Sequence, residues 1–364
     1  MKLVFTSYVN SPEYDRPEAW LKRIEANKGI LEDLSNTHHV IGIERINYEG
    51  EYRQQGVHYF FINLKRKTTY FPFRIHGLIK RLKPDVVFVN GFIFPLQIIQ
   101  LRLALGKAVK IIVLHRAEKP FTGIKKYLQK LADKCVNAYL FSSADFKEQW
   151  KKNIDTAKIH EVIQSSSVFY PVDKGLAKKT LGIKSGPVFL WVGRLNANKD
   201  PLTVLKAFIK FLRVQSSARL YMIYGTKDLL PEIKELIEIN QVSQSIILIG
   251  SIQHDQLLHW YNSADFIISG SHYEGGGAAI TEAMSCGCIP VITNISSFRM
   301  LTANGEHGFL YEAGNEKDLL ATLFQTVKIN IEEKRTNVLQ HFTDELSFEA
   351  IGRKINVILT DQYV

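Results

Sequence analysis

The chain has 364 residues, of which 46% are hydrophobic, and a formal net charge of +10 at pH 7. One hydrophobic core rarely serves a chain of this length, so we expect two domains of about 150 to 200 residues each. Residues 89–106 form the most apolar long stretch, yet polar and charged side chains interrupt it, which argues against a membrane-spanning helix. Three cysteines without paired spacing argue against a disulfide framework or a zinc site.

The N-terminal segment indicates where the protein acts. Residues 1–8 become polar after Phe5 and fit a first strand better than a signal peptide. Because cysteine usage also fits a reducing compartment, we expect a cytoplasmic protein.

The N-terminal half alternates between short apolar runs and amphipathic stretches. Residues 85–91 are typical, because a buried strand there ends in a polar residue and a glycine. Strands that alternate with helices form parallel sheets, so the pattern predicts a doubly wound α/β domain. We expect strands at residues 3–9, 40–46, 59–64, 85–91, 109–114 and 138–142, and helices at residues 17–34, 75–82, 95–105, 123–135 and 144–152.

The C-terminal half repeats this alternation and predicts a second α/β domain. The domain junction is expected near residues 163–171, and the last helix is expected at residues 347–359. The other expected strands lie at residues 187–192, 219–224, 245–249, 266–269 and 289–293, and the other expected helices at residues 201–215, 229–239, 254–263 and 278–286.

A glycine loop that leads into a helix is the most informative stretch of the chain. Glycines at 275–277 let a ligand approach the backbone closely, and the start of the helix after them presents free N–H groups to an anion. Glu274 and Glu282 lie on either side of this anion site. At about 1.5 Å rise per helical residue they are too far apart to act as one acid–base pair. They fit two ends of a long ligand with an anion in its middle, such as a nucleotide sugar.

Three blocks of sequence resemble retaining glycosyltransferases of family four, which have the GT-B fold. The first is HYEGGGAAITEAMSCGCIPVI at residues 272–292, with its two glutamates eight residues apart. The second is FLWVGRL at residues 189–195, followed by KDPL at residues 199–202. The third is NGEHGFLY at residues 304–311. The blocks stand in the order that the family has.

This resemblance implies two Rossmann-like doubly wound parallel-sheet domains that face a central cleft. It implies an acceptor-binding domain at residues 1–168, a nucleotide-sugar-binding domain at residues 169–346, and a C-terminal helix at residues 347–364 that packs back on the first domain. The implied activity is that of a hexosyltransferase that uses a UDP- or GDP-sugar and a glycan or lipid-linked acceptor in cell-surface polysaccharide or glycolipid synthesis.

The resemblance also assigns roles to residues. Glu274 would hold the donor sugar and Glu282 the ribose, and Arg194 and Lys199 would stabilise the leaving diphosphate. We expect no metal and no other cofactor, because the sequence offers no Asp-x-Asp pair and no cluster spaced for a metal. The predicted donor-binding residues, taken together, are Gly193, Gly275, Gly276, Gly277, Ala278 and Glu282.

The acceptor side is expected at the ends of the N-terminal strands. His115 follows a strand and resembles the family's cleft histidine, so it joins the predicted catalytic residues Arg194, Lys199 and Glu274. Asn90 and Gly91 end another strand and should face the same cleft. The family's glycine pair after the first strand is absent, and Asn10 and Ser11 stand there as weaker acceptor-side candidates.

The basic residues are concentrated in the first half. Residues 1–164 carry 27 Lys and Arg against 16 Asp and Glu. Clusters lie at residues 65–67, 74–83, 125–134 and 147–152, and residues 71–83 mix cations with aromatic and aliphatic side chains, as interfacial segments do. An anionic membrane surface, reached from the cytoplasmic inner face, is a candidate partner beside a solvated helix face. No nucleic acid is expected.

Two other readings stay open. A nucleotide-sugar epimerase or hydrolase on the same fold would convert the donor without an acceptor. A non-catalytic protein that binds membrane or nucleic acid through its basic half would keep no nucleotide-sugar affinity.

Overall fold

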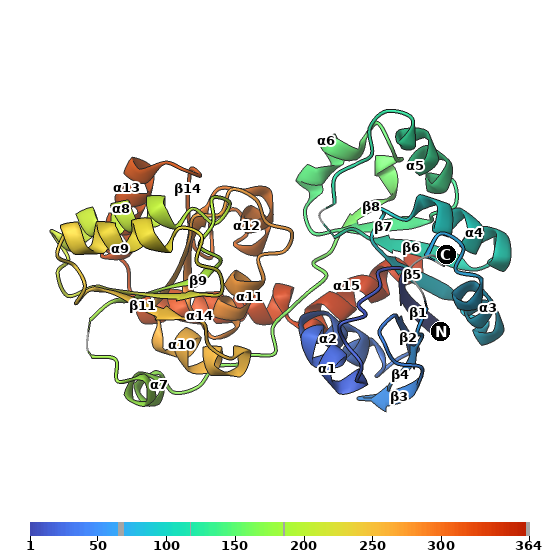
Figure 1. The fold of residues 1–364 in the computed structure, drawn as a ribbon, viewed down its shortest axis with the longest axis horizontal. Coiled ribbons are helices and arrows are strands. Elements are labelled where there is room, and N and C mark those ends of the chain that lie inside the picture. Colours follow the sequence, from blue (N-terminus) through green and yellow to red (C-terminus); the bar gives the residue numbers. More distant parts are fainter. Residues whose placement is uncertain (65–68, 117, 185, 362–364) are drawn as a thin grey trace. The chain divides into compact units, whose positions relative to one another are not determined.

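The computed structural model describes residues 1–64, 69–116, 118–184 and 186–361, so the basic cluster at residues 65–67 lies outside the described residues. The chain divides into two compact units (Figure 1). The N-terminal unit comprises Met1–Ser166 and Phe348–Val364, and the C-terminal unit comprises Ser167–Ser347. This division lies two residues before the boundary expected from the sequence, which is after residue 168.

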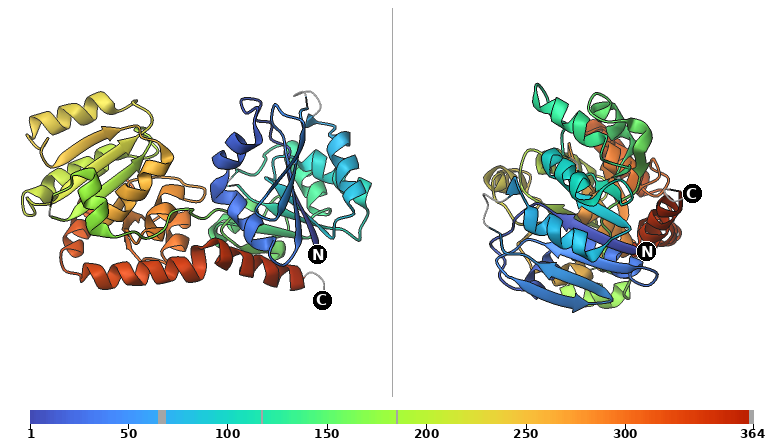
Figure 2. Two further views of the ribbon diagram at one scale, coloured as in Figure 1. Left: turned by 90° about the horizontal axis from the view of Figure 1, so that it is seen from below. Right: turned by 90° about the vertical axis from the view of Figure 1, so that its right-hand side faces the viewer.

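The N-terminal unit is built on a sheet with the strand order β3-β4-β2-β1-β5-β6-β7-β8, in which β3 alone of the described strands runs antiparallel to its neighbour. Figure 2 shows helices on both faces of this sheet. Phe5 and Phe88 stack across β1 and β5 with ring centroids 4.3 Å apart, and both side chains are buried. The strands are β1 (Lys2–Ser7), β2 (His39–Glu44), β3 (Gly50–Gln54), β4 (Val57–Phe61), β5 (Val86–Asn90), β6 (Lys110–Leu114), β7 (Ala138–Phe141) and β8 (Ile159–Glu161).

The helices of this unit depart from the predictions at two places. The expected helix at residues 17–34 is two helices, because Ile24 leaves the helical region with φ −103° and ψ 18°. The expected helix at residues 144–152 is a 3₁₀ turn followed by one short helix. The helices are α1 (Pro17–Arg23), α2 (Glu25–Leu34), α3 (Phe73–Leu82), α4 (Pro95–Leu105), α5 (Lys125–Asp133), α6 (Lys147–Trp150) and α15 (Phe348–Asp361).

A β-hairpin that the sequence analysis did not predict forms the sheet edge. Strands β3 and β4 pair antiparallel, and Gln55 and Gly56 connect them with φ values of +46° and +78°. Two consecutive residues with positive φ are typical of the tight turn that matches the twist of a hairpin. The strand β3 is polar along its length, so it lacked the apolar run that revealed the other strands.

The last helix, α15, belongs to the N-terminal unit, as the resemblance implied. It packs against α2 so closely that a Cβ added at Gly29 would stand 2.6 Å from the ring of Phe348. Further along α15, His38 Nε2 and Asn356 Oδ1 are hydrogen-bonded at 2.8 Å. The close fit of Gly29 against Phe348 ties the end of the chain to its first 40 residues.

The C-terminal unit is a doubly wound domain around a parallel sheet with the order β11-β10-β9-β12-β13-β14. Phe189 and Phe266 stack across its central strands with centroids 4.7 Å apart. Its strands are β9 (Val188–Gly193), β10 (Arg219–Tyr224), β11 (Ile246–Gly250), β12 (Phe266–Ser269), β13 (Ile289–Thr293) and β14 (Phe309–Tyr311). Its helices are α7 (Lys174–Leu181), α8 (Pro201–Leu212), α9 (Leu230–Ile239), α10 (Leu257–Ser263), α11 (Ala278–Ser285), α12 (Ser296–Leu301), α13 (Glu316–Thr326) and α14 (Ile331–His341).

The strand order places the two most informative loops side by side. Strands β9 and β12 are neighbours in the sheet and run parallel, so the loops that follow them leave the same edge. The fold thus predicted, two Rossmann-like parallel-sheet domains with a last helix returned to the first, is confirmed.

Candidate functional site

The loops after β9 and β12 in the C-terminal unit are joined by backbone and side-chain hydrogen bonds. The amide of His272 donates to the carbonyl of Asn198 at 2.8 Å, and Asn198 Nδ2 donates to the carbonyl of Tyr273 at 3.0 Å. Gly270 makes this approach possible, because a Cβ there would stand 2.7 Å from the carbonyl oxygen of Asp200. The two loops therefore form one continuous surface, called the platform below.

Lys199 and Glu274, both predicted site residues, form an ion pair on this platform. Lys199 Nζ contacts Glu274 Oε1, and the hydroxyl of Ser271 donates to the same oxygen at 2.8 Å. The side chains of Lys199 and Glu274 are 24% and 15% exposed, so both ends of the pair remain open to a ligand. An ammonium has three donors and a carboxylate has about four acceptor positions, so this pair can make further hydrogen bonds to a ligand.

The glycine loop leads into α11 as predicted from its sequence. Gly277 precedes the helix with φ +63°, and a Cβ on it would stand 2.9 Å from atoms of Leu301 and Phe298. Only glycine fits this conformation and this space. Ala278 is exposed and Ala279 half-buried at the first turn, where the backbone N–H groups lack helical partners and can meet an anion.

Glu282 lies on α11, one turn beyond Ala278, and is held by two side chains. The hydroxyl of Tyr261 donates to Oε2 at 2.8 Å, and His254 Nε2 lies 2.9 Å from Oε1. Burial and the charge of Glu282 raise the pKa of Tyr261 well above its usual value, so the phenol stays protonated and donates. Glu282 is thus a positioned carboxylate on a small-residue helix face rather than a freely solvated one.

Gly193 and Arg194 follow directly from the end of β9. Gly193 is half-buried, and a Cβ on it would stand 3.1 Å from the indole of Trp191. Arg194 is exposed, and within the part of the chain that the structure describes its guanidinium has no hydrogen bond or ion pair. This leaves all its donors available to a phosphate, which Arg can grip in a bidentate manner.

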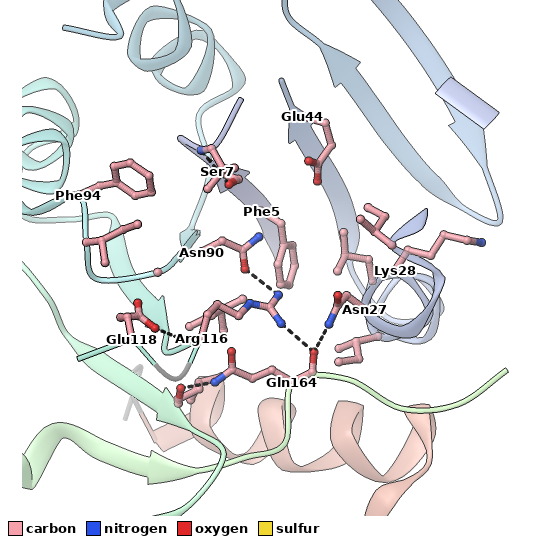
Figure 3. Close-up of a pocket in the computed structure, with 18 of the residues that line it drawn as sticks. Phe5, Ser7, Asn27, Lys28, Glu44, Asn90, Phe94, Arg116, Glu118 and Gln164 are labelled. Atoms are coloured by element: carbon pink, nitrogen blue, oxygen red, sulfur yellow. Dashed lines mark hydrogen bonds between the residues drawn. The ribbon is translucent and has the colours of Figure 1, made fainter. Parts of the chain in front are cut away.

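The residues predicted for the acceptor side belong to the N-terminal unit, and only some of them line a cavity there. Asn90 and Gly91 line a cavity at the carboxyl ends of the strands, together with Arg116 and Glu118 (Figure 3). Arg116 donates to the Asn90 side chain at 2.9 Å. Asn10 and Ser11 do not line this cavity. The Ser11 amide instead donates to the carbonyl of Arg45 at 3.0 Å, which anchors the loop after β1.

The structure corrects the expected placement of His115. Its side chain is only 1% exposed, and its ring stacks on Phe141 with centroids 4.0 Å apart and meets Trp150 at 5.5 Å. Burial lowers the pKa of His115, so the ring is neutral, and its Nε2 lies 3.1 Å from the carbonyl of Glu118. An aromatic core thus holds the ring beneath the loop, and Glu118, not His115, lines the cavity.

Sequence reasoning missed several residues that shape these sites. Tyr261, His254 and Ser271 come from segments with no motif, and only the fold brings them to Glu282 and Glu274. Among the described residues there is no cluster of three or more His, Cys, Asp or Glu arranged for a metal ion. Metal independence stays a prediction.

Comparison with known proteins finds a family match over the residues that form this site. Residues 173–339 match the profile of the family described as Glycosyl transferases group 1. The D-inositol 3-phosphate glycosyltransferase of Acidothermus cellulolyticus is 28% identical over 40% of this chain and 35% of its own length. The alpha-monoglucosyldiacylglycerol synthase of Streptococcus pneumoniae is 26% identical over 51% of this chain and 42% of its own length. The matched stretches therefore span less than half of these relatives.

Solved structures share the whole fold. Anabaena HepE in complex with UDP aligns over 99% of this chain and all of its own, with a TM-score of 0.72 and 12% identity. At that identity the likeness concerns the fold alone.

Proposed function

We propose, from the match of residues 173–339 to the glycosyl transferases group 1 family, that this protein moves a sugar from a UDP- or GDP-sugar to a glycan or lipid-linked acceptor. The reaction would be metal-independent and would retain the anomeric configuration. The observation that supports this best is the glycine loop with a positioned carboxylate on each side. Glu274 forms an ion pair with Lys199, and Glu282 accepts a hydrogen bond from Tyr261.

The chemistry follows from where charge develops. When the bond between the sugar and the diphosphate breaks, negative charge builds on the leaving phosphate. Arg194 and the remaining donors of Lys199 can neutralise that charge, and the N–H groups at the start of α11 add a fixed positive potential. Glu274 would accept hydrogen bonds from sugar hydroxyls while its partner Lys199 reaches the phosphate. Glu282 would accept from the ribose.

The donor assignment gains support from one neighbour and the acceptor assignment from one relative. The solved structure of Anabaena HepE is a complex with UDP, and the Streptococcus pneumoniae relative is named as a synthase of a glycosylated diacylglycerol. We therefore propose a glycolipid acceptor for this protein, and the experiment below tests that proposal.

The experiment is a donor assay on the full chain. UDP-glucose, UDP-galactose and GDP-mannose are incubated with the enzyme in EDTA, with and without a glycolipid extract, and nucleotide release is followed. Release that requires the extract supports a transferase. Nucleotide release without the extract would instead identify a hydrolase, and a changed sugar in the recovered donor without release would identify an epimerase. Absence of nucleotide binding in a separate titration would favour the non-catalytic alternative.

A membrane surface is a second proposed partner, and α5 is the element that favours it. Ile124, Tyr127 and Leu131 form one helical stripe and are 88%, 65% and 51% exposed. Exposed lysines at 125, 130 and 134 flank that stripe. Apolar side chains between cations are typical of helices that lie in the interface of an anionic bilayer. No helix among the described residues is long and apolar enough to span a bilayer.

Vesicle sedimentation tests this surface. The protein should bind vesicles that contain phosphatidylglycerol, bind phosphatidylcholine vesicles weakly, and lose binding as salt rises. Tyr127→Asp should reduce binding at least about tenfold, because it places a charge within the stripe. Val214→Asp alters a side chain that is 71% exposed in the other unit and serves as the matched control. Equal loss in both variants would contradict the assignment of α5.

A further inference from the structure

Two aromatic side chains of the C-terminal unit hold the carboxylate of Glu282. Helix α10, which carries Tyr261, lies beside α11, which carries Glu282 (Figure 1). His254 is the first residue of the 3₁₀ turn that precedes α10. The hydroxyl of Tyr261 donates to Oε2 of Glu282 at 2.8 Å, and Nε2 of His254 lies 2.9 Å from Oε1. Because an ionised carboxylate only accepts hydrogen bonds, each of its oxygens receives one from an aromatic side chain.

Phe169 packs against both of these donors. Its ring centroid lies 4.9 Å from that of His254 and 5.6 Å from that of Tyr261, and Phe169 itself is buried. A side chain that contacts both rings restricts their rotamers, so the two hydrogen bonds to Glu282 keep one geometry. His254 depends on this contact more than Tyr261 does, because the His254 side chain is 42% exposed and Tyr261 is fully buried.

The segment that carries Phe169 is itself bonded to both helices. Ser285 on α11 donates to the hydroxyl of Ser167 at 2.8 Å. Asn262 on α10 is buried and donates to the carbonyl of Tyr170 at 3.0 Å. The residues on either side of Phe169 are therefore held to α10 and to α11, and its ring stays between the two donors.

This arrangement suits a ligand with two neighbouring hydroxyl groups. A carboxylate has about four acceptor positions, so Glu282 can accept further hydrogen bonds from a ligand after those from Tyr261 and His254. One further bond on each oxygen matches the adjacent hydroxyls of a ribose. A carboxylate that turned freely would have to be fixed when the nucleotide binds, and this ordering would cost affinity.

We infer that His254 is a positioning residue for ribose recognition: its Nε2–H holds Oε1 of Glu282, and Phe169 holds its ring, so that the carboxylate accepts from both ribose hydroxyls at once. The inference rests on the proposed function, because it concerns how the donor nucleotide of that reaction is recognised. Tyr261 alone would fix one oxygen and leave the carboxylate free to turn about that bond. The second donor sets its orientation.

Titration calorimetry of nucleoside diphosphates into the full chain in EDTA tests this inference. The probes are UDP and GDP, each compared with its dideoxy form, which lacks both ribose hydroxyls. The wild-type protein should bind one of the two ribonucleotides at least about tenfold more tightly than the corresponding dideoxy form. His254→Phe keeps an aromatic ring against Phe169 but removes the N–H donor. It should lower the affinity for that ribonucleotide ~3–10-fold and change the affinity for the dideoxy form less than about twofold.

Two further variants complete the comparison. His254→Gln restores an N–H donor and should bring the preference for the ribonucleotide back to within about threefold of wild type. His58→Phe is the matched control in the other unit, because His58 Nε2 lies 2.8 Å from Glu51 Oε2 and its ring centroid lies 4.4 Å from that of Phe60. It removes the same kind of bond from a similar setting and should leave both affinities unchanged.

The ratio of the two affinities separates positioning of Glu282 from general damage to the fold. A loosened C-terminal unit would weaken both nucleotide forms equally. Equal weakening in His254→Phe, or none, overturns the inference and leaves the proposed function intact, and so does failure of His254→Gln to restore the preference. Absence of binding by both UDP and GDP to the wild-type protein contradicts the proposed function and, with it, the inference.

Discussion

Replacement of Glu44 by glutamine should stabilise the protein increasingly as pH rises. The carboxyl is buried among apolar walls, and its pKa is raised from 4.5 to about 7. A carboxyl whose folded pKa exceeds its unfolded pKa keeps its proton in the folded state while the unfolded state loses it. The wild-type protein therefore loses stability between pH 4.5 and pH 7, and above pH 7 the loss is complete. Glutamine carries no charge and avoids that loss.

The magnitude follows from the two pKa values. One pKa unit corresponds to about 1.4 kcal/mol, so the shift from 4.5 to about 7 removes roughly 3 kcal/mol of wild-type stability at pH 8.5. At pH 5 the same group removes less than about 1 kcal/mol. The difference between Glu44→Gln and wild type should therefore grow by roughly 2 kcal/mol over this range, whatever constant offset the buried amide adds.

Urea unfolding followed by circular dichroism at pH 5, 7 and 8.5 measures this difference. Glu13→Gln is the matched control, because Glu13 is exposed and its stability curve should parallel wild type. If the curves of Glu44→Gln and wild type were also parallel, the carboxyl would not lie in an apolar site. The raised pKa of Glu44 would then be refuted.

Three further predictions concern the C-terminal unit. Gly277→Ala should lower the free energy of unfolding by ~1–3 kcal/mol in thermal or urea unfolding, because the new Cβ is strained and crowded, whereas Gly225→Ala has open space and should be near neutral. Tyr261→Phe should weaken UDP binding by calorimetry ~3–10-fold through loss of one hydrogen bond to Glu282. Arg194→Ala should reduce kcat ~100-fold with little change in KM, as steady-state kinetics can show, and an unchanged kcat would remove Arg194 from the reaction.

The fold was largely predictable because its signals are local. Alternating apolar runs and amphipathic stretches mark the strands and helices one by one, and the glycine loop with its helix can be recognised from twenty adjacent residues. The failures have equally local causes. Strand β3 is polar, so no apolar run indicates the hairpin that it forms. The helix expected at residues 17–34 is interrupted at Ile24, where no glycine or proline indicates a break.

Residues of the candidate site could be predicted only where they belong to a recognisable sequence motif. Lys199 and Glu274 were both selected, but their ion pair joins residues 75 positions apart and depends on the order of strands in the sheet. Tyr261 and His254 meet Glu282 for the same reason. The place of His115 after a strand predicted that it faces the cleft, whereas the structure shows that Phe141 and Trp150 enclose its ring.

The central claim is that residues 173–339 hold a nucleotide-sugar donor between Glu274 and Glu282. Titration calorimetry of UDP and GDP into the full chain in EDTA, repeated with Glu282→Ala, tests it most directly. The claim predicts that one of the two nucleotides binds at a single site without metal and loses at least about tenfold in affinity in the variant. Absence of binding by both nucleotides, or equal binding by wild type and Glu282→Ala, would contradict it.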